Sequence, residues 1–472
     1  MRETHPTTLI ILGATGDLAQ KKIFPALLDL YSKEMLPPTL TLVAFARREY
    51  SDETFREFVR AAVAHKEKST EQVEAFLECI FYARGALDDV SGYSNLSNYL
   101  RDLDVRLDVC SNKLFYLATP PHLYKTIFTL LSDSGLTIPC IPGANDDMTI
   151  WTRVLVEKPF GNSLAGAREL DTLLGQLFTE DQIYRIDHYL AKETVQNLIS
   201  FRFSNGIFEP LWNKDHIERV EIRVLEKGSA IGRGAFYDGV GALTDVGQNH
   251  ILQMLALIAM EHPGGMSPEN IRNARSQALM DIVFTPMPHT LIHGQYEGFA
   301  QEPGVRPDSQ TETYFKTIVQ VNNQRWSGVL FTIESGKALH ENVADIKVYF
   351  KEAAACLCPP GGHDHQNVLT FTIQPHEGVS LLMWTKKPGF VFELTPTPIT
   401  YAYAEGSETE EIPDAYERIL FDCIRGDQTL FVTQRGVLAE WKVVEEIQHA
   451  WSAIPLVYYK ERSRPETISN DS

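Results

Sequence analysis

Residues 8–19 read TLIILGATGDLA, and this stretch decides the fold. A short apolar run, Thr8–Leu12, leads directly into Gly13-x-x-Gly16-x-x-Ala19, and a helical pattern follows. The first glycine permits a tight turn, the second lets the backbone approach a pyrophosphate, and the small third residue lets a helix pack on a sheet. A phosphate at this turn would face the unpaired N–H groups of the helix N-terminus. The stretch therefore predicts a dinucleotide-binding strand, turn and helix.

Apolar runs and helical patterns continue to alternate up to about residue 186. The expected strands are Thr8–Leu12, Leu40–Ala46, Ile80–Ala83, Leu114–Ala118, Arg153–Val156 and Gln182–Ile186. Ser51 is expected to cap the helix that follows the second strand, because Asp52 and Glu53 stand in its first turn. Strict alternation of strand and helix predicts a parallel α/β dinucleotide-binding (Rossmann-like) domain over residues 1–186.

The pattern changes after residue 186, where alternating strands follow one another without intervening helices. Examples are Val220–Val224, Asp345–Phe350, Val368–Ile373 and Val379–Met383. This pattern is typical of a half-covered sheet, and it predicts an α+β domain over residues 187–472 with a large, mostly antiparallel sheet. Residues 249–260 are apolar nearly all round and predict a buried helix, whereas the polar residues 462–472 are expected to be loose.

Composition excludes several classes of partner. The 472 residues carry a net charge of −19, which opposes binding to nucleic acid or to anionic membranes. No apolar run reaches the roughly 18 residues of a membrane-spanning helix. The six cysteines are scattered, and the close pair Cys356 and Cys358 has no second pair to complete a zinc site, so no metal centre is expected. A reducing, cytoplasmic location fits this composition.

The end of the second strand indicates which dinucleotide binds. An NAD enzyme usually places Asp or Glu there to accept a hydrogen bond from the ribose 2′-OH, whereas this chain has Ala46-Arg47-Arg48. A guanidinium matches a 2′-phosphate, so Arg47 favours NADP. NAD remains open as a secondary cofactor.

Three further segments carry candidate chemistry: residues 157–161 (EKPFG), 185–193 (RIDHYLAKE) and 245–250 (DVGQNH). Together with residues 13–22 (GATGDLAQKK), they make the chain resemble the glucose-6-phosphate dehydrogenase family along nearly its whole length. Weaker matches in the same order are residues 294–296 (GQY), 311–313 (TET), 325–328 (RWSG), 335–337 (SGK), 387–389 (KPG) and 413–418 (PDAYER).

The resemblance implies roles for the reacting groups. His250 would be the base that takes a hydroxyl proton, which suits a group that titrates near neutral pH, and Asp187 would orient it. His188 and Lys192 are four residues apart and are expected on one face of a helix after the sixth strand, where they and Tyr189 would bind a phosphate. Lys158 would reach both sugar and nicotinamide, next to a cis peptide before Pro159.

The resemblance also implies the remaining contacts. Sugar hydroxyls would be bound by Glu226, Asp245, Lys337 and Gln374. The cofactor would be contacted by Gly13, Ala14, Thr15, Gly16, Asp17, Leu18, Arg47, Gly85, Ala86, Tyr116 and Lys158. Two positions depart from the family pattern: Asn342 stands where a second basic residue is usual, and Ala191 replaces a glycine.

The implied reaction is oxidation of β-D-glucose 6-phosphate at C1 to 6-phospho-D-glucono-1,5-lactone, with hydride transfer to NADP. This is the first step of the oxidative pentose phosphate pathway, and the family implies a homodimer or homotetramer. Two alternatives stay open. One is a dehydrogenase for another sugar or sugar phosphate, and the other is a non-catalytic NADP-binding homologue, which Asn342 alone encourages.

Overall fold

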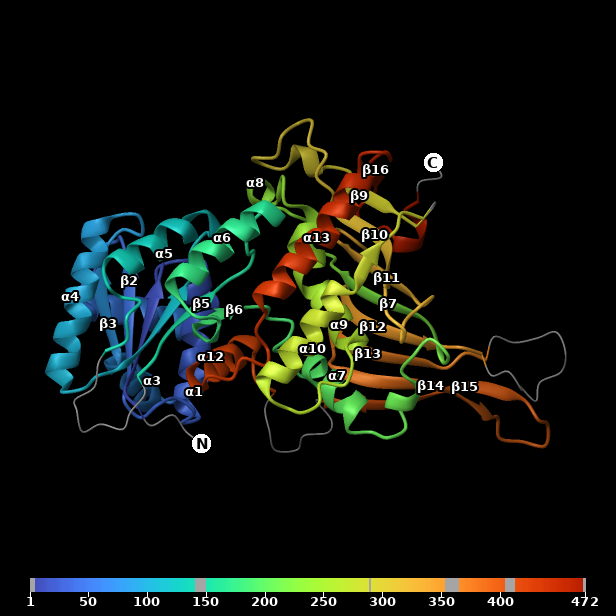
Figure 1. Cartoon of the computed structure of the whole chain (residues 1–472), viewed down its shortest axis with the longest axis horizontal. Helices are drawn as coiled ribbons and strands as arrows, with labels where there is room; N and C mark the ends of the chain where they lie inside the picture. The colour runs from blue at the N-terminus through green and yellow to red at the C-terminus, as the bar shows by residue number, and fades with distance from the viewer. Residues whose placement is uncertain (1–4, 141–149, 288–289, 353–364, 404–411, 470–472) are drawn as a thin grey trace. The chain divides into compact units, whose positions relative to one another are not determined.

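The structure is a computed structural model that divides the chain into two compact units (Figure 1). It describes residues 5–140, 150–287, 290–352, 365–403 and 412–469. Unit 1 comprises residues 1–191, 267–272 and 413–434, and unit 2 comprises residues 192–266, 273–412 and 435–472. Each unit is built on one sheet.

The sheet of unit 1 is parallel throughout and has the strand order β3-β2-β1-β4-β5-β6. This order places β1 and β4 side by side at the centre, where the direction of the crossovers reverses and a ligand is expected at the carboxyl ends. The strands are β1 (Thr7–Leu12), β2 (Leu40–Ala46), β3 (Ile80–Arg84), β4 (Asn112–Leu117), β5 (Thr152–Val156) and β6 (Ile183–Arg185). The Rossmann-like fold expected for this part of the chain is confirmed.

Helices lie on both faces of this sheet (Figure 1). Ser51 caps α2 as expected, because its side chain accepts a hydrogen bond from the backbone N–H of Thr54. Asp414 caps α12 in the same manner. The helices of unit 1 are α1 (Phe24–Ser32), α2 (Asp52–Val63), α3 (Thr70–Glu78), α4 (Val90–Leu107), α5 (Tyr124–Asp133), α6 (Leu164–Leu177) and α12 (Ala415–Arg425).

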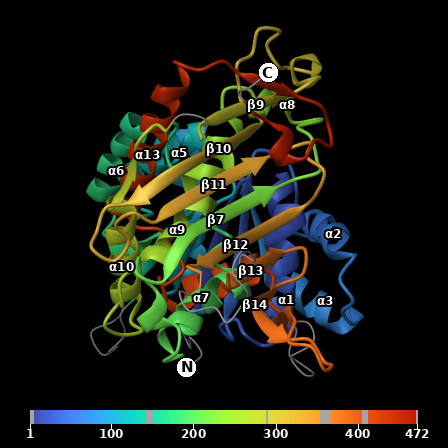
Figure 2. The same cartoon turned by 90° about the vertical axis from the view of Figure 1, so that its right-hand side faces the viewer.

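Unit 2 carries a large mixed sheet, which Figure 2 shows face on. Its order is β15-β14-β13-β12-β7-β11-β10-β9-β16, with β8 paired to β10. All neighbours are antiparallel except β7 with β11 and β9 with β16, so the mostly antiparallel sheet is confirmed. The strands are β7 (Ile217–Leu225), β8 (Ile282–Phe284), β9 (Ile292–Tyr296), β10 (Tyr314–Val321), β11 (Leu330–Gly336), β12 (Val343–Phe350), β13 (Val368–Gln374), β14 (Gly378–Lys386), β15 (Leu394–Ala402) and β16 (Val457–Tyr459).

The buried helix expected at residues 249–260 begins earlier and has two parts. A π-helix, η5 (Leu243–Ile251), continues into α9 (Leu252–Ala259), whose eight residues are all buried. π-Helical turns inside α-helices are rare and occur frequently at functional sites. The other helices of this part of the fold are α7 (Glu193–Phe203), α8 (Gly234–Tyr237), α10 (Pro268–Met280), of which the first residues belong to unit 1, and α13 (Gln434–Trp451), of which Gln434 does.

Three side chains hold the carboxyl end of α9. The carbonyls of its last three residues accept hydrogen bonds from Arg202 Nη1, Trp212 Nε1 and Trp326 Nε1, over 2.9, 2.8 and 2.8 Å. These carbonyls have no partner within the helix itself, and burial would otherwise leave them unsatisfied. The end of the helix is therefore fixed by side chains that are themselves fully buried.

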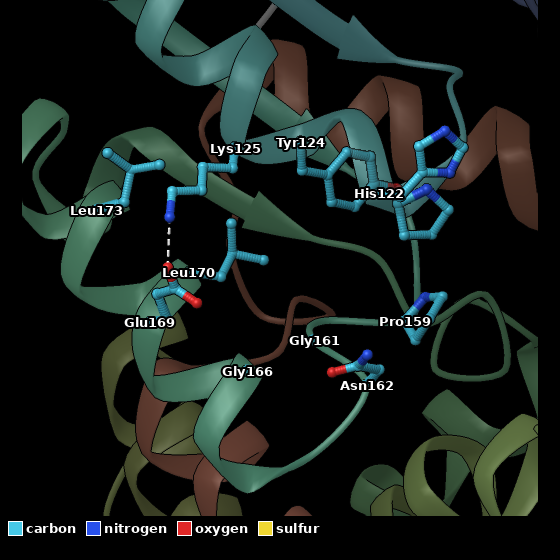
Figure 3. Close-up of a pocket in the computed structure, with 11 residues that line it drawn as sticks. His122, Tyr124, Lys125, Pro159, Gly161, Asn162, Gly166, Glu169, Leu170 and Leu173 are labelled. Carbon is cyan, nitrogen blue, oxygen red and sulfur yellow. Dashed lines mark hydrogen bonds and ion pairs between the residues drawn. The ribbon is translucent and has the colours of Figure 1, made fainter.

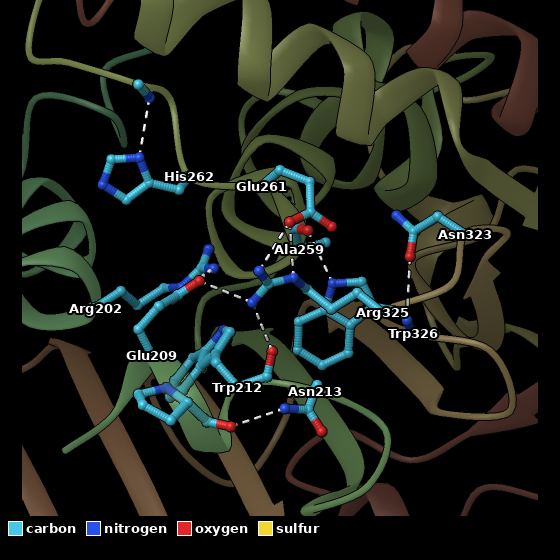
Figure 4. A network of polar contacts seen from close by, with 12 residues as sticks. Arg202, Glu209, Trp212, Asn213, Ala259, Glu261, His262, Asn323, Arg325 and Trp326 are labelled. Carbon is cyan, nitrogen blue, oxygen red and sulfur yellow. Dashed lines mark hydrogen bonds and ion pairs between the residues drawn. The ribbon is translucent and has the colours of Figure 1, made fainter. Parts of the chain in front are cut away.

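A charged network supports this arrangement (Figure 4). Glu209 accepts hydrogen bonds from both Arg202 and Arg325, over 3.2 and 2.8 Å. Arg325 also pairs with Glu261 over 2.8 Å. A guanidinium that is buried needs such partners, because desolvation penalises an isolated charge heavily.

Two features of the structure differ from the sequence-based expectations. Residues 463–468 are ordered against the core and not loose: Ser463 forms a bridge with Leu339, and Ile468 is buried in a cluster with Leu339 and Tyr459. Cys110 and Cys140 form a disulfide with a Cα–Cα distance of 5.8 Å, a pairing that the scattered cysteines did not indicate. Cys356 and Cys358 lie outside the described residues.

Candidate active site

The glycine turn after β1 has the geometry that the sequence predicted. Gly13 adopts φ +85°, and its N–H donates to the Phe45 carbonyl of β2 over 2.9 Å. A Cβ at this position would lie 2.5 Å from the carbonyl oxygen of Ala118, so only glycine fits. The N–H of Gly16 closes the turn onto the Gly13 carbonyl over 2.9 Å.

A pocket of about 410 Å³ opens at this turn, at the carboxyl ends of β1 to β4. Five of the predicted cofactor residues line it: Gly13, Thr15, Gly16, Arg47 and Ala86. Its wall also contains residues that the sequence analysis did not single out, namely Leu87, Asp88, Ala118, Thr119, Pro120 and Leu123. Their position directly after β3 and β4 was the available signal, because ligands of such sheets bind at the carboxyl ends of the strands.

The pocket fits a dinucleotide. The buried hydroxyl of Thr119 has no hydrogen-bond partner within the described part of the chain, and Thr119 lines the pocket. Buried polar groups without partners are uncommon and indicate a ligand or water. Arg47 lines the pocket whereas Arg48 does not, so only Arg47 of these two adjacent arginines contributes to the pocket wall.

The other predicted cofactor residues do not line this pocket. Ala14 is buried, and Asp17 is exposed and pairs with Lys21 over 2.7 Å. Gly85 packs so closely on the ring of Phe45 that a Cβ would overlap it. The lining of this cavity includes neither these three residues nor Leu18, Tyr116 and Lys158.

Tyr116 and Glu157 connect the ends of β4 and β5. The Tyr116 hydroxyl donates to Glu157 Oε1 over 2.6 Å, and the Tyr124 hydroxyl donates to the backbone carbonyl of Glu157 over 2.9 Å. Burial raises the pKa of Glu157 to about 7, although hydrogen bonds from Tyr116 and Tyr416 act in the opposite direction. The residue that precedes Lys158 is therefore held from three sides.

A second pocket, of about 310 Å³, adjoins the turn after β5 (Figure 3). Pro159 and Gly161 contribute to one wall, Leu170 and Leu173 to another, and Lys125 pairs with Glu169 at its margin. The Lys158–Pro159 peptide is cis. The short turn at residues 120–123 separates this pocket from the first, because its residues contribute to both.

The segment after β6 forms a turn and not the expected helix. The side chain of Asp187 accepts a hydrogen bond from the Tyr189 N–H over 2.9 Å. The backbone carbonyl of Asp187 accepts one from the Leu190 N–H over 3.1 Å. Helix α7 begins only at Glu193, with Lys192 as its N-cap. His188 and Lys192 are therefore not one helical turn apart. Such aspartate turns compete with helix formation, which explains the difference.

His188 lies between aromatic rings of unit 1. Its ring stacks on that of Tyr416 at 6.4 Å between centroids and meets that of Tyr189 edge-on at 5.1 Å. Tyr416 belongs to α12, which lies far along the chain. The aromatic contacts fix the imidazole plane.

In unit 2, Glu226 and Lys337 are paired. Lys337 Nζ lies 2.6 Å from Glu226 Oε2 and 5.3 Å from the centre of the Tyr237 ring. The two residues come directly after β7 and β11, which are parallel neighbours in register from Arg219 with Leu330 to Leu225 with Gly336. The carboxyl ends of these strands thus bring together two of the predicted substrate residues.

Asp245 and His250 both lie on the π-helix η5. A π-helix has i→i+5 hydrogen bonds, which place residues five apart on consecutive turns. His250 is buried, with 2% of its surface exposed. Its backbone N–H donates to Asn249 Oδ1 over 2.8 Å. Gln374 is exposed and ends β13, two strands away from β7.

Comparisons with known proteins identify the family. The C-terminal domain model of glucose-6-phosphate dehydrogenase matches residues 199–470, and the NAD-binding domain model matches residues 10–197. The chain is 36% identical to glucose-6-phosphate 1-dehydrogenase 5, cytoplasmic, of Arabidopsis thaliana, over 98% of this chain and 90% of the relative. It is 38% identical to the glucose-6-phosphate 1-dehydrogenase of Aggregatibacter actinomycetemcomitans, over 93% and 90%.

A solved structure agrees with these matches. Glucose-6-phosphate dehydrogenase in complex with its substrate glucose-6-phosphate superposes with a TM-score of 0.88 at 32% identity, covering 98% of this chain and 96% of the other. Within the described ranges, no helix combines the length and hydrophobicity needed to cross a bilayer. With a nicotinamide-dinucleotide pocket after β1 and matches along both domains, the chain belongs to the glucose-6-phosphate dehydrogenase family.

Proposed function

We propose that this chain oxidises β-D-glucose 6-phosphate at C1 to 6-phospho-D-glucono-1,5-lactone and transfers the hydride to NADP, the first step of the oxidative pentose phosphate pathway. The observation that carries the proposal is the full-length likeness to a glucose-6-phosphate dehydrogenase solved with that substrate. The pocket at the glycine turn and the Glu226–Lys337 pair support it independently.

His250 is the base in this proposal. It takes the proton of the C1 hydroxyl while the hydride leaves the same carbon, so the sugar loses two electrons and two hydrogens and becomes the lactone. NADP, when bound, supplies the hydride acceptor. Asp187 orients the imidazole and stabilises its protonated form, the arrangement that activates histidine bases elsewhere.

The remaining residues bind the substrate. His188, Tyr189 and Lys192 bind the phosphate, and the stacking of His188 on Tyr416 supports this role because it fixes the ring. Lys337, Glu226, Asp245 and Gln374 bind sugar hydroxyls. Lys158 contacts sugar and nicotinamide.

NADP is the preferred cofactor in this proposal, and NAD is secondary. The position of Arg47 in the wall of the cofactor pocket supports it, because the planar guanidinium matches a phosphate group. Ala14, Asp17, Leu18, Gly85 and Tyr116 complete the cofactor site around Gly13, Thr15, Gly16 and Ala86. In this proposal residues 1–186 supply the cofactor domain and residues 187–472 supply the substrate and oligomerisation domain, although residues 187–191, 267–272 and 413–434 pack with unit 1.

A homodimer or homotetramer in the cytoplasm is also proposed. The hairpin of β14 and β15 supports subunit association, because β15 is an edge strand and Phe390, Val391 and Phe392 are exposed at its tip. Exposed apolar patches and open sheet edges usually mark interaction surfaces. The cytoplasmic location rests on the names of plant relatives.

The test is an assay of NADPH formation by absorbance with glucose 6-phosphate, glucose and galactose 6-phosphate. We expect turnover with glucose 6-phosphate far above that with the other two. Turnover only on free sugars would contradict the phosphate site, and tight NADP binding without turnover would favour the non-catalytic homologue. His250→Asn should abolish turnover while NADP binding, measured by calorimetry, is retained.

A further inference from the structure

The turn that leads into the π-helix η5 is held by a segment from elsewhere in the chain. The N–H of Ala242 donates to the backbone carbonyl of Glu312 over 3.1 Å, and the N–H of Leu243 donates to Glu312 Oε1 over 2.9 Å. Two consecutive N–H groups at the start of the helix are thus satisfied by one residue. Ala242, the N-cap, makes no side-chain cap of its own.

The carboxylate of Glu312 is built into this turn. Gly241 has φ +74°, and a Cβ there would overlap both carboxylate oxygens. Only 7% of the Glu312 surface is exposed. The glycine therefore leaves the space that the carboxylate occupies, directly below the first N–H groups of the helix.

Neighbouring contacts tie the same two segments together. Asp238 accepts hydrogen bonds from Arg306 Nε over 2.9 Å, Ser309 Oγ over 2.5 Å and Thr311 Oγ1 over 2.8 Å. Farther along, the first turns of η5 pack on β10, because a Cβ at Gly247 would lie 2.8 Å from the Phe315 ring. The segment that contains Glu312 thus follows the helix on toward His250.

We propose that Glu312 is a positioning residue for the reaction: its carboxyl fixes where η5 begins and thereby sets the placement of Asp245 and His250. This inference rests on the proposed function, which assigns proton transfer to His250. Proton transfer depends steeply on geometry, and a shift of about 1 Å can cost roughly a hundredfold in rate. Loss of the carboxyl would leave the buried N–H of Leu243 without its acceptor, whereas the N–H of Ala242 keeps the backbone carbonyl, and the first turn of the helix would relax.

The experiment compares Glu312→Ala, Glu312→Gln and a control, Glu334→Ala. Glu334 is a buried carboxyl on neighbouring β11 that accepts a hydrogen bond from the Tyr314 hydroxyl over 2.6 Å. For Glu312→Ala we expect kcat to fall about tenfold or more, with KM for glucose 6-phosphate and NADP within about threefold of wild type. Glu312→Gln should restore kcat to within about threefold, because its amide oxygen still accepts from Leu243. Glu334→Ala should lower Tm and leave kcat nearly unchanged.

A kinetic isotope effect with glucose 6-phosphate deuterated at C1 provides a second measurement. Misplacement of His250 slows the chemical step, so the isotope effect on kcat should rise in Glu312→Ala and stay at the wild-type value in Glu334→Ala. Should Glu312→Ala fail to fold, Gly241→Ala perturbs the same contact. It should likewise lower kcat and leave both KM values nearly unchanged.

The outcomes separate this inference from the proposed function. Equal loss of kcat in Glu312→Ala and Glu334→Ala, or wild-type kcat in Glu312→Ala while His250→Asn is inactive, overturns the positioning role alone. Full activity of His250→Asn overturns the assignment of His250 as the base and with it the reason for the positioning role, whereas absence of turnover of glucose 6-phosphate by the wild type overturns the proposed function itself.

Discussion

Asn342 Oδ1 accepts a hydrogen bond from the backbone N–H of Lys227 over 2.6 Å. Lys227 directly follows Glu226, whose carboxylate pairs with Lys337. Neither Lys nor Arg has an acceptor atom, so a basic residue at position 342 could not make this contact. The departure from the family pattern thus has a structural role, because Asn342 fixes the backbone beside a candidate substrate residue.

The charge at position 342 should tune substrate affinity. Asn342→Asp keeps the acceptor and adds a negative charge, so KM for glucose 6-phosphate should rise roughly threefold to tenfold. Asn342→Lys adds a positive charge but loses the acceptor for the Lys227 N–H, so KM should fall by a smaller factor than Asn342→Asp raises it. Initial-rate kinetics at low ionic strength check both variants, with KM for NADP as the internal control. A change of the same sign in both variants would contradict a charge effect.

Arg47 and Arg48 provide a matched pair for cofactor selection. Arg47→Asp places a carboxylate in the pocket wall and should raise KM for NADP by about tenfold or more, with a much smaller effect on KM for NAD. Arg48→Asp makes the same charge change outside that wall and should affect NADP far less. Steady-state kinetics with both cofactors measure these KM values. An equal rise of KM for NADP and for NAD in Arg47→Asp would mean that Arg47 does not bind the 2′-phosphate.

The fold was predictable where local pattern determines it. Buried parallel strands such as β1 and β2 are continuous apolar runs, and the glycine turn needs residues with special backbone freedom, so sequence alone located them. The pairing of Glu226 with Lys337 was not predictable from spacing, because it depends on β7 and β11 becoming parallel neighbours.

Two expectations failed because tertiary or side-chain contacts override local pattern. The helical spacing of His188 and Lys192 was wrong, since the Asp187 side chain stabilises a turn instead. The C-terminal segment appeared loose because Ile468 is a lone apolar residue there, yet it reaches the core. The sequence did not indicate that Glu312 caps η5, because its partner Leu243 lies about seventy residues away in sequence.

Glu209 should matter far more for stability than Glu261, although both pair with Arg325. Glu209 also compensates fully buried Arg202, and burial lowers the pKa of that arginine to about 10. Glu209→Gln should therefore cost about 2–4 kcal/mol of unfolding free energy. The side chain of Glu261 is 58% exposed. Glu261→Gln should therefore lower the free energy of unfolding by under about 1 kcal/mol. Urea denaturation followed by tryptophan fluorescence measures both; similar losses would contradict the dominance of the buried charge.

Glu312 should also make stability depend on pH. Burial raises its pKa from 4.5 to about 7, so between these values the folded protein holds a proton that the unfolded chain has released. Stability from this group is then present at low pH and is lost as pH rises through about 7, by at most about 3 kcal/mol. The phenol of Tyr237 stays neutral throughout, because burial holds its pKa well above 10. Glu312→Gln cannot titrate, so its Tm relative to wild type should become more positive between about pH 5 and about pH 8. Glu297 is exposed, and Glu297→Gln is the control, for which calorimetry should show no such trend. If the Tm difference between Glu312→Gln and wild type does not change with pH, the Glu312 carboxyl lies in a solvated site.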